Sequence, residues 1–141
     1  MKVVILDTRN TDAIIESFIA HGYTEFIVFG RVNLTYYALN KIDVTRINGF
    51  ACEGGSQRLQ KIRGSLKNRF FVAYAPVDVD LASVEKRHSQ GQGTVTVIEQ
   101  DKRMVAAILE PEVFDYMDSF VSLEKDVLPS VGNDGDLQVY N

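Results

Sequence analysis

Cysteine is almost missing from this sequence, which holds Cys52 and no other cysteine among its 141 residues. A single cysteine excludes an intrachain disulfide and any zinc site built from a cluster of cysteines. Because disulfides are typical of secreted proteins and rare in the cytosol, we expect a cytoplasmic protein. We expect Cys52 itself to be partly buried rather than a nucleophile, since no paired histidine and acid can be identified.

Long apolar runs and basic runs are missing as well. Only four consecutive apolar residues, 3–6, precede Asp7, which is too short a run for a signal peptide. Nowhere do about 18 apolar residues follow one another, as a membrane span requires. The net charge is −4 and the pI is near 5.1. We therefore expect neither nucleic acid nor a membrane surface among the partners.

The remaining composition is that of a globular protein, with 45% hydrophobic and 24% charged residues. At this length the chain is long enough to bury a real core, and the balance argues against extensive disorder. No repeat, low-complexity tract or linker divides it. The sequence therefore predicts a single domain over residues 1–141.

The first apolar run predicts the central strand of this domain. Residues 3–6 read Val-Val-Ile-Leu, without the alternation of a half-exposed strand. Such a run is typical of a strand covered on both faces in a parallel α/β sheet. It delivers residues 7–10, Asp-Thr-Arg-Asn, to the carboxyl edge of the sheet, where open α/β sheets bind their ligands.

Strands and helices alternate along the rest of the chain. Apolar runs predict further strands at residues 26–29, 42–47, 70–74, 94–99, 104–109 and 137–140. Amphipathic patterns and capping residues predict helices at residues 12–21 (capped by Asn10 or Thr11 and ended by Gly22), after Asn33, from Gly54-Gly55, after Asp78 or Asp80, from Pro111, and at 123–128. The order predicts a mostly parallel sheet with a short antiparallel addition and helices on both faces.

Three segments in this order resemble the sugar-phosphate nucleotidyltransferases, and most closely the glucose-1-phosphate cytidylyltransferase branch. Residues 108–118, Ile-Leu-Glu-Pro-Glu-Val-Phe-Asp-Tyr-Met-Asp, are similar to the family's late strand followed by Pro-Glu-Val. Residues 14–28 resemble its first helix and second strand, and residues 54–81 resemble its Gly-Gly-Arg-Leu helix, buried strand and aspartate-capped helix. The resemblance implies a reduced form of the three-layer, Rossmann-like nucleotide-diphospho-sugar transferase fold. It also implies a protein family that joins a nucleoside triphosphate to a sugar 1-phosphate and releases pyrophosphate.

The chain departs from this family where the chemistry would be. Family members follow the first strand with a long glycine-rich loop and a Lys-Pro pair, and here the strand runs directly into Asp7. Such loops hold the triphosphate with backbone N–H groups, and basic residues offset its charge. The family's Mg²⁺-binding aspartate follows the third buried strand, and here Ala75-Pro76 follow Tyr74. We therefore expect a degenerate, catalytically silent protein with no catalytic residues, no metal ligands and no cofactor, Mg²⁺ being implied only if the chain is active.

The candidate ligand-binding residues are few. Thr8-Arg9 resembles the end of the family's phosphate loop, Gly54-Gly55 opens a helix whose free N–H groups can bind an anion, and Arg58 follows in the same helix. Each has an alternative without a ligand: a solvated arginine, a steric need for glycine, or a solvated helix face. A nucleotide or sugar phosphate is the ligand class that the resemblance implies.

Three functions remain open from the sequence. The first is a silent binding or assembly module linked to nucleotide-sugar or polysaccharide biosynthesis, working as a homo-oligomer or with a partner protein. Loss of the family's sugar-binding segment should leave apolar surface near the turn at 99–104 for such a partner to cover. The second is an active nucleotidyltransferase whose rearranged site recruits Arg9, Arg58 and Asp78. The third is a nucleotide-binding regulator without chemistry.

Overall fold

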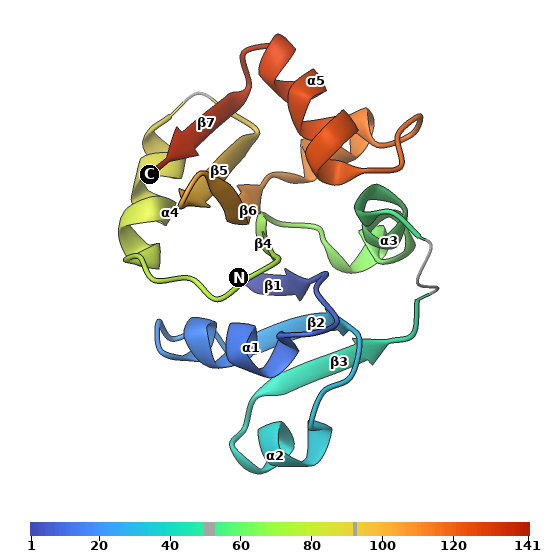
Figure 1. The fold of residues 1–141 in the computed structure, drawn as a ribbon, viewed down its shortest axis with the longest axis vertical. Coiled ribbons are helices and arrows are strands. Elements are labelled where there is room, and N and C mark those ends of the chain that lie inside the picture. Colours follow the sequence, from blue (N-terminus) through green and yellow to red (C-terminus); the bar gives the residue numbers. More distant parts are fainter. Residues whose placement is uncertain (50–52, 92) are drawn as a thin grey trace.

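A seven-stranded sheet forms the centre of the computed structural model, which describes residues 1–49, 53–91 and 93–141 (Figure 1). The strands lie in the order β3-β2-β1-β4-β6-β5-β7. Their bounds are β1 (Lys2–Ile5), β2 (Glu25–Phe29), β3 (Asp43–Ile47), β4 (Phe70–Ala73), β5 (Val95–Gln100), β6 (Arg103–Leu109) and β7 (Leu137–Tyr140). Only β6 runs against its neighbours, because β4 and β5 both pair with it in antiparallel fashion and the other pairs are parallel. The predicted α/β class with a mostly parallel sheet is confirmed.

The first strand is central, as its apolar run predicts. Val3, Val4 and Ile5 are each 0% exposed, and β1 pairs with β2 on one side and with β4 on the other. Val4 belongs to the core on one face of the sheet, and Val3 and Ile5 belong to the core on the other face. The unalternating sequence is therefore explained by helices that cover both faces.

Each face of the sheet has its own helical layer. One core contains residues of α1 (Thr11–Ile19), α2 (Leu34–Leu39) and α4 (Leu81–Gln90). The other contains residues of α3 (Gly55–Lys61) and α5 (Leu128–Asn133), together with a 3₁₀ turn at Pro111–Tyr116 and a π-helical turn at Leu123–Val127. Within the described residues, no helix is long and apolar enough to cross a membrane.

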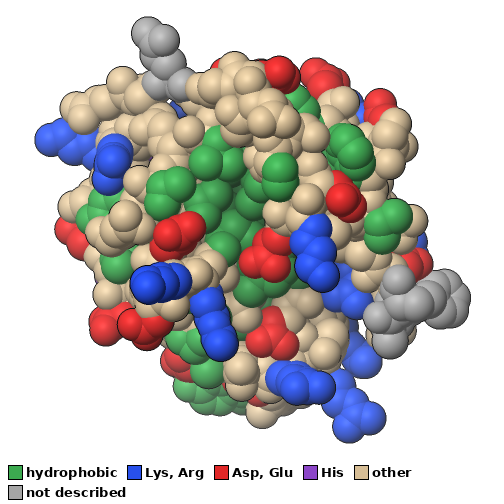
Figure 2. All heavy atoms as spheres, turned by 45° about the horizontal axis from the view of Figure 1, so that its top comes forward, with side chains coloured by type: hydrophobic (Ala, Val, Ile, Leu, Met, Phe, Trp, Pro, Cys, Tyr) green, Lys and Arg blue, Asp and Glu red, His purple; other side chains and the backbone are tan. Residues whose placement is uncertain are grey.

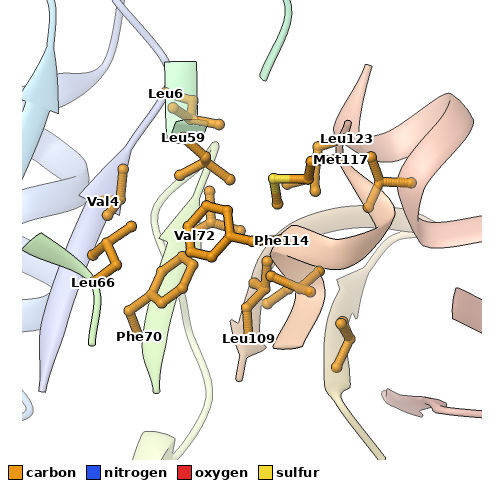
Figure 3. Packing of buried hydrophobic residues seen from close by; sticks show 14 of the residues in the cluster. Val4, Leu6, Leu59, Leu66, Phe70, Val72, Leu109, Phe114, Met117 and Leu123 are labelled. Atoms are coloured by element: carbon orange, nitrogen blue, oxygen red, sulfur yellow. The ribbon is translucent and has the colours of Figure 1, made fainter. Parts of the chain in front are cut away.

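The core under α3 joins the two halves of the chain (Figure 3). Phe70 at the start of β4 stacks on Phe114, with ring centroids 6.0 Å apart. Leu6 and Leu59 approach from the carboxyl end of β1 and from α3, and Leu123 approaches from the C-terminal third. Burial of these large side chains fixes α3 and residues 111–128 relative to the strand ends that form the site described below.

Several local predictions are confirmed. Asn33 caps α2 by accepting from the Tyr36 amide at 3.1 Å, and Asp80 caps α4 by accepting from the Ala82 amide at 3.1 Å. Gly22 takes the left-handed conformation, with φ of 89°. Strands β5 and β6 form the predicted hairpin, whose turn carries positive φ at both Asp101 and Lys102.

Three local predictions were wrong. Asn10 occupies the N-cap position of α1 but makes no side-chain capping bond, and the Thr11 hydroxyl donates to the Asp7 carbonyl oxygen instead. The helix predicted from Gly54-Gly55 with Leu59, Ile62 and Leu66 on one face includes only Leu59, because α3 ends at Lys61 and a 3₁₀ turn, Arg63–Ser65, follows. Pro111 opens a 3₁₀ turn rather than an α-helix. Cys52 lies outside the described residues.

Candidate functional site

A cavity of about 300 Å³ lies at the carboxyl edge of the first three parallel strands. Each strand contributes the residues at its end, because neighbouring parallel strands open at the same edge of a sheet. Thr8 follows β1, and Arg58 enters from α3. The remaining lining comes from the ends of β2 and β3: Phe29, Gly30, Arg31, Arg46, Ile47, Asn48 and Gly49.

Arg58 is the best-positioned cation of the cavity. A terminal nitrogen of its guanidinium, Nη1, donates to the Leu6 carbonyl oxygen at 3.0 Å, and the group lies 5.8 Å from the centroid of the Phe29 ring. Its Nε is buried and has no hydrogen-bond partner among the described residues. Glu53 Oε2 is likewise buried without a partner among these residues, and both atoms lie within 4 Å of the position that a Cβ at Gly49 would take.

Two further arginines face the same space. The Nε of Arg46 donates to the Gly30 carbonyl oxygen at 2.9 Å, which ties the end of β3 to the end of β2. Arg31 and Arg46 are exposed to solvent, and both line the cavity. An acid lies nearby, because Glu53 approaches the position that a Cβ at Gly49 would take, but its Oε1 pairs with Lys61 at 2.6 Å.

Of the predicted ligand-binding residues, the cavity brings together Thr8 and Arg58. Arg9 is exposed on the same short loop and is not part of the lining, and its amide donates to Asp7 Oδ1 at 2.7 Å. Thr8 packs against Gly30, where an added Cβ would lie 3.1 Å from the Thr8 Cα. Thr8 is therefore held against β2, and Arg9 extends beyond the cavity along the loop.

Gly54 and Gly55 pack against the C-terminal third of the chain. A Cβ at Gly54 would lie 2.0 Å from the Val121 carbonyl oxygen, so only glycine permits this approach. The Ser56 amide donates to the same oxygen at 3.2 Å, and the Ser56 hydroxyl donates to the Phe120 carbonyl oxygen. The two glycines therefore have a steric role that positions α3, the helix that carries Arg58.

The carboxyl end of β4 presents a tyrosine. The amides of Tyr74 and Ala75 both donate to the Val105 carbonyl oxygen, at 2.9 and 3.2 Å. Burial raises the pKa of the Tyr74 phenol, repulsion from Glu124 adds to this rise, and Arg58 partly offsets it. A phenol in this state does not suit Mg²⁺, which takes carboxylate, phosphate and water oxygens. The described residues contain no cluster of three or more His, Cys, Asp or Glu side chains that could hold a metal ion.

A second polar cluster lies inside the protein, away from this edge. His88 Nδ1 contacts the Thr96 hydroxyl at 2.7 Å, and His88 Nε2 contacts Glu110 Oε1 at 2.9 Å. Arg69 pairs with the same carboxylate at 2.9 Å. A hydroxyl, an imidazole and a carboxylate in a row resemble a nucleophile with its base, but Thr96 is 0% exposed, so no substrate reaches it. The cluster is therefore structural.

Sequence reasoning missed Arg31, Arg46 and the partners of His88. A signal for the two arginines exists, since each lies at the end of a predicted parallel strand. Asp80 lies away from the cavity lining and has the predicted capping role: hydrogen bonds from Ser83, first of all from its hydroxyl at 2.8 Å, lower the pKa of Asp80.

Comparison with known proteins gives similarity in structure only, because no family model and no curated protein matches the sequence. A protein assigned as a glucose-1-phosphate thymidylyltransferase from Bacillus anthracis, solved with sucrose, superposes with a TM-score of 0.71 at 8% identity, over 99% of this chain and 85% of that one. HddC from Yersinia pseudotuberculosis, in complex with GMP-PN, gives 0.65 at 14% identity, over 99% and 89%. The inositol-1-phosphate CTP transferase from T. maritima gives 0.67 at 10% identity, over 99% and 84%. The chain therefore has the three-layer, Rossmann-like fold that these proteins share.

Proposed function

We propose that this chain binds a phosphorylated ligand, a nucleotide or a sugar phosphate, in the arginine-lined cavity without transferring a nucleotidyl group. It would serve as a binding module in nucleotide-sugar or polysaccharide biosynthesis. The observation that carries this proposal is the convergence of Arg31, Arg46 and Arg58 on one cavity at the carboxyl edge of the sheet. One protein of the same fold was solved with GMP-PN, which supports a nucleotide as the ligand.

The chemistry of the lining suits phosphate. Guanidinium groups offer several N–H donors in a plane and bind phosphate oxygens in pairs. Arg58 lines the cavity from α3, and Thr8 adds a hydroxyl. In this proposal Arg9 contacts a part of the ligand that extends out of the cavity, while Gly54 and Gly55 place α3 so that Arg58 reaches it. A volume of about 300 Å³ is at the lower end of the range for small-molecule sites.

Two features favour binding over transfer. Only residues 6–10 connect β1 to α1, and none of them is a glycine, so the strand leads to no loop that could wrap a triphosphate. At the end of β4, Tyr74 packs into the core beside Gly55. Phosphoryl transfer depends on metal ions and basic groups positioned around the reacting phosphate. Residues 6–10 supply one basic side chain, Arg9, and no lysine, and Tyr74 and Ala75 after β4 supply no carboxylate for a metal ion.

Binding is tested by thermal-shift and calorimetric titration with CTP, UTP, GTP, dTTP and glucose 1-phosphate. A ligand that binds only the native state raises the unfolding midpoint. At a concentration of 100 times Kd it adds about 2.7 kcal/mol to the free energy of unfolding. We expect Arg46→Gln to weaken binding by roughly tenfold or more, as loss of a charge-assisted hydrogen bond does. Arg103→Gln, an exposed arginine outside the cavity lining, is the matched control and should bind as the wild type does.

Two results would contradict the proposal. No shift and no heat at millimolar concentration of every ligand would exclude useful affinity for this class. Sustained release of pyrophosphate from a nucleoside triphosphate, a sugar 1-phosphate and Mg²⁺, abolished by Arg9→Ala, would establish an active transferase in place of a silent module.

A further inference from the structure

Strand β7 forms one edge of the sheet. It is the last strand in the order, and its four residues read Leu-Gln-Val-Tyr, with no charge and no proline. Edge strands offer unpaired backbone groups to other chains, and proteins usually block them with charged residues, proline or a covering element. The opposite edge, β3, carries Asp43 and Arg46. The two edges of one sheet therefore differ in the feature that prevents pairing.

An apolar groove runs beside β7. It has a volume of about 350 Å³ and lies between α5 and the sheet face of β5, β6 and β7. Leu137 and Val139, two residues apart on β7, line the groove from the same face of the strand. Val97, Met104 and Leu128 complete its apolar lining. Val139 is 38% exposed. This is the apolar surface near the 99–104 turn that the sequence predicts.

The rim of this face carries both signs of charge. Figure 2, which turns α5 and β7 towards the viewer, shows hydrophobic side chains in a hollow with acidic and basic side chains around it. Glu99 and Glu124 belong to the lining itself. A rim of one sign would select a partner of opposite charge. A rim with both signs lets acidic groups of one subunit face basic groups of the other, and a twofold interface requires such a match because it joins the same patch of two subunits.

We propose that the occupant of this face is a second copy of the chain. The β7 strands of the two copies pair in antiparallel fashion about a twofold axis, so that the two sheets become continuous. Each copy then covers the groove of the other, and Val139 lies near the centre of the contact. The pairing satisfies backbone groups of a strand that has a neighbouring strand on one side only, and it removes the apolar groove from water.

Sedimentation velocity and light scattering over a concentration series test this proposal. We expect the wild type to reach twice the monomer mass of 15.8 kDa. Val139→Lys should remain monomeric over the same range, because two like charges would meet at the twofold axis. Leu39→Lys on α2 is the matched control, since it charges a more exposed apolar residue (79% against 38%) on a helix packed beside β3, the other edge of the sheet. It should dimerise as the wild type does.

Hydrogen exchange on the wild type gives a second test that requires no variant. The amides of β7 should become more protected as the concentration rises, while those of β3 should not change. A wild type that stays monomeric throughout the series would overturn the proposal. So would a dimer that Leu39→Lys abolishes and Val139→Lys leaves intact, or a dimer in which β7 gains no protection. None of these outcomes depends on ligand binding at the carboxyl-edge cavity, so the two proposals fail independently.

Discussion

Replacing His88 tests whether the cluster of His88, Thr96 and Glu110 stabilises the fold rather than carrying out catalysis. His88 is 3% exposed on α4 and bridges the Thr96 hydroxyl of β5 and the Glu110 carboxylate that follows β6. The informative variants are His88→Leu, Thr96→Val and the double variant, because they separate the loss of a contact from the cost of an unsatisfied group. Arg69 pairs with Glu110 in all of them.

The expected magnitudes follow from burial. His88→Leu leaves the Thr96 hydroxyl, which is 0% exposed, without the imidazole, and an unsatisfied buried group costs about 1–3 kcal/mol. Thr96→Val leaves His88 Nδ1 unsatisfied at a similar cost of about 1–3 kcal/mol. The double variant removes both groups of that contact and leaves Glu110 with Arg69. Its loss of unfolding free energy should therefore fall below the sum of the single losses by about 1–2 kcal/mol.

Urea denaturation of the four proteins at one pH and ionic strength measures this cycle. Additivity within about 0.5 kcal/mol would refute the reasoning, because it would mean that the two side chains do not satisfy each other. A hydrolytic activity lost in Thr96→Val would also refute it, since it would require a substrate to reach a hydroxyl that is 0% exposed.

Two further predictions concern local features. Gly54→Ala should lower the unfolding free energy by about 1–3 kcal/mol, because its Cβ would lie 2.0 Å from the Val121 carbonyl oxygen. Gly64→Ala, whose Cβ would meet nothing within 4 Å, is the control for urea denaturation, and equal effects would contradict the steric account. Asp80→Ala should lower stability at neutral pH, because the native pKa of Asp80 is depressed and its contribution is fully present above its unfolded pKa. The difference should vanish as the pH falls through the native pKa, and a gap that is constant in a pH series of melting curves would contradict this origin.

Much of the fold could be predicted because local patterns report burial. The run at residues 3–6 indicated burial on both faces, and β1 lies between β2 and β4. Asp80 and Asn33 cap the helices predicted for them. The capping bond predicted at the start of α1 failed for a backbone reason. Asn10 has φ −113° and ψ 27°, outside the extended region from which an N-cap side chain reaches the first-turn amides.

The cavity could be predicted only in part, because it depends on which strands are neighbours. Arg31 and Arg46 are 15 residues apart in the sequence, and they meet because β2 and β3 are adjacent and parallel. The register places Arg46 opposite Val28, from where its Nε reaches the Gly30 carbonyl oxygen. Thr8 and Arg58 were identified by a resemblance in sequence that carries no distances. An apolar sequence pattern predicts each strand but not its neighbours in the sheet. It therefore cannot show that the three arginines line one cavity.

The fold and the site place different demands on the same strand ends. The interior of β4 requires only apolar side chains of suitable size, and Phe70 and Val72 meet this requirement at 0% exposure. The position after β4 faces both the core and the carboxyl edge. A carboxylate there must be paired with a cation to offset its desolvation, whereas the Tyr74 phenol stays neutral and packs beside α3. Tyr74 therefore extends the hydrophobic core to the edge of the sheet, and in the proposed function the positive charge of Arg31, Arg46 and Arg58 serves a ligand that brings its own negative charge.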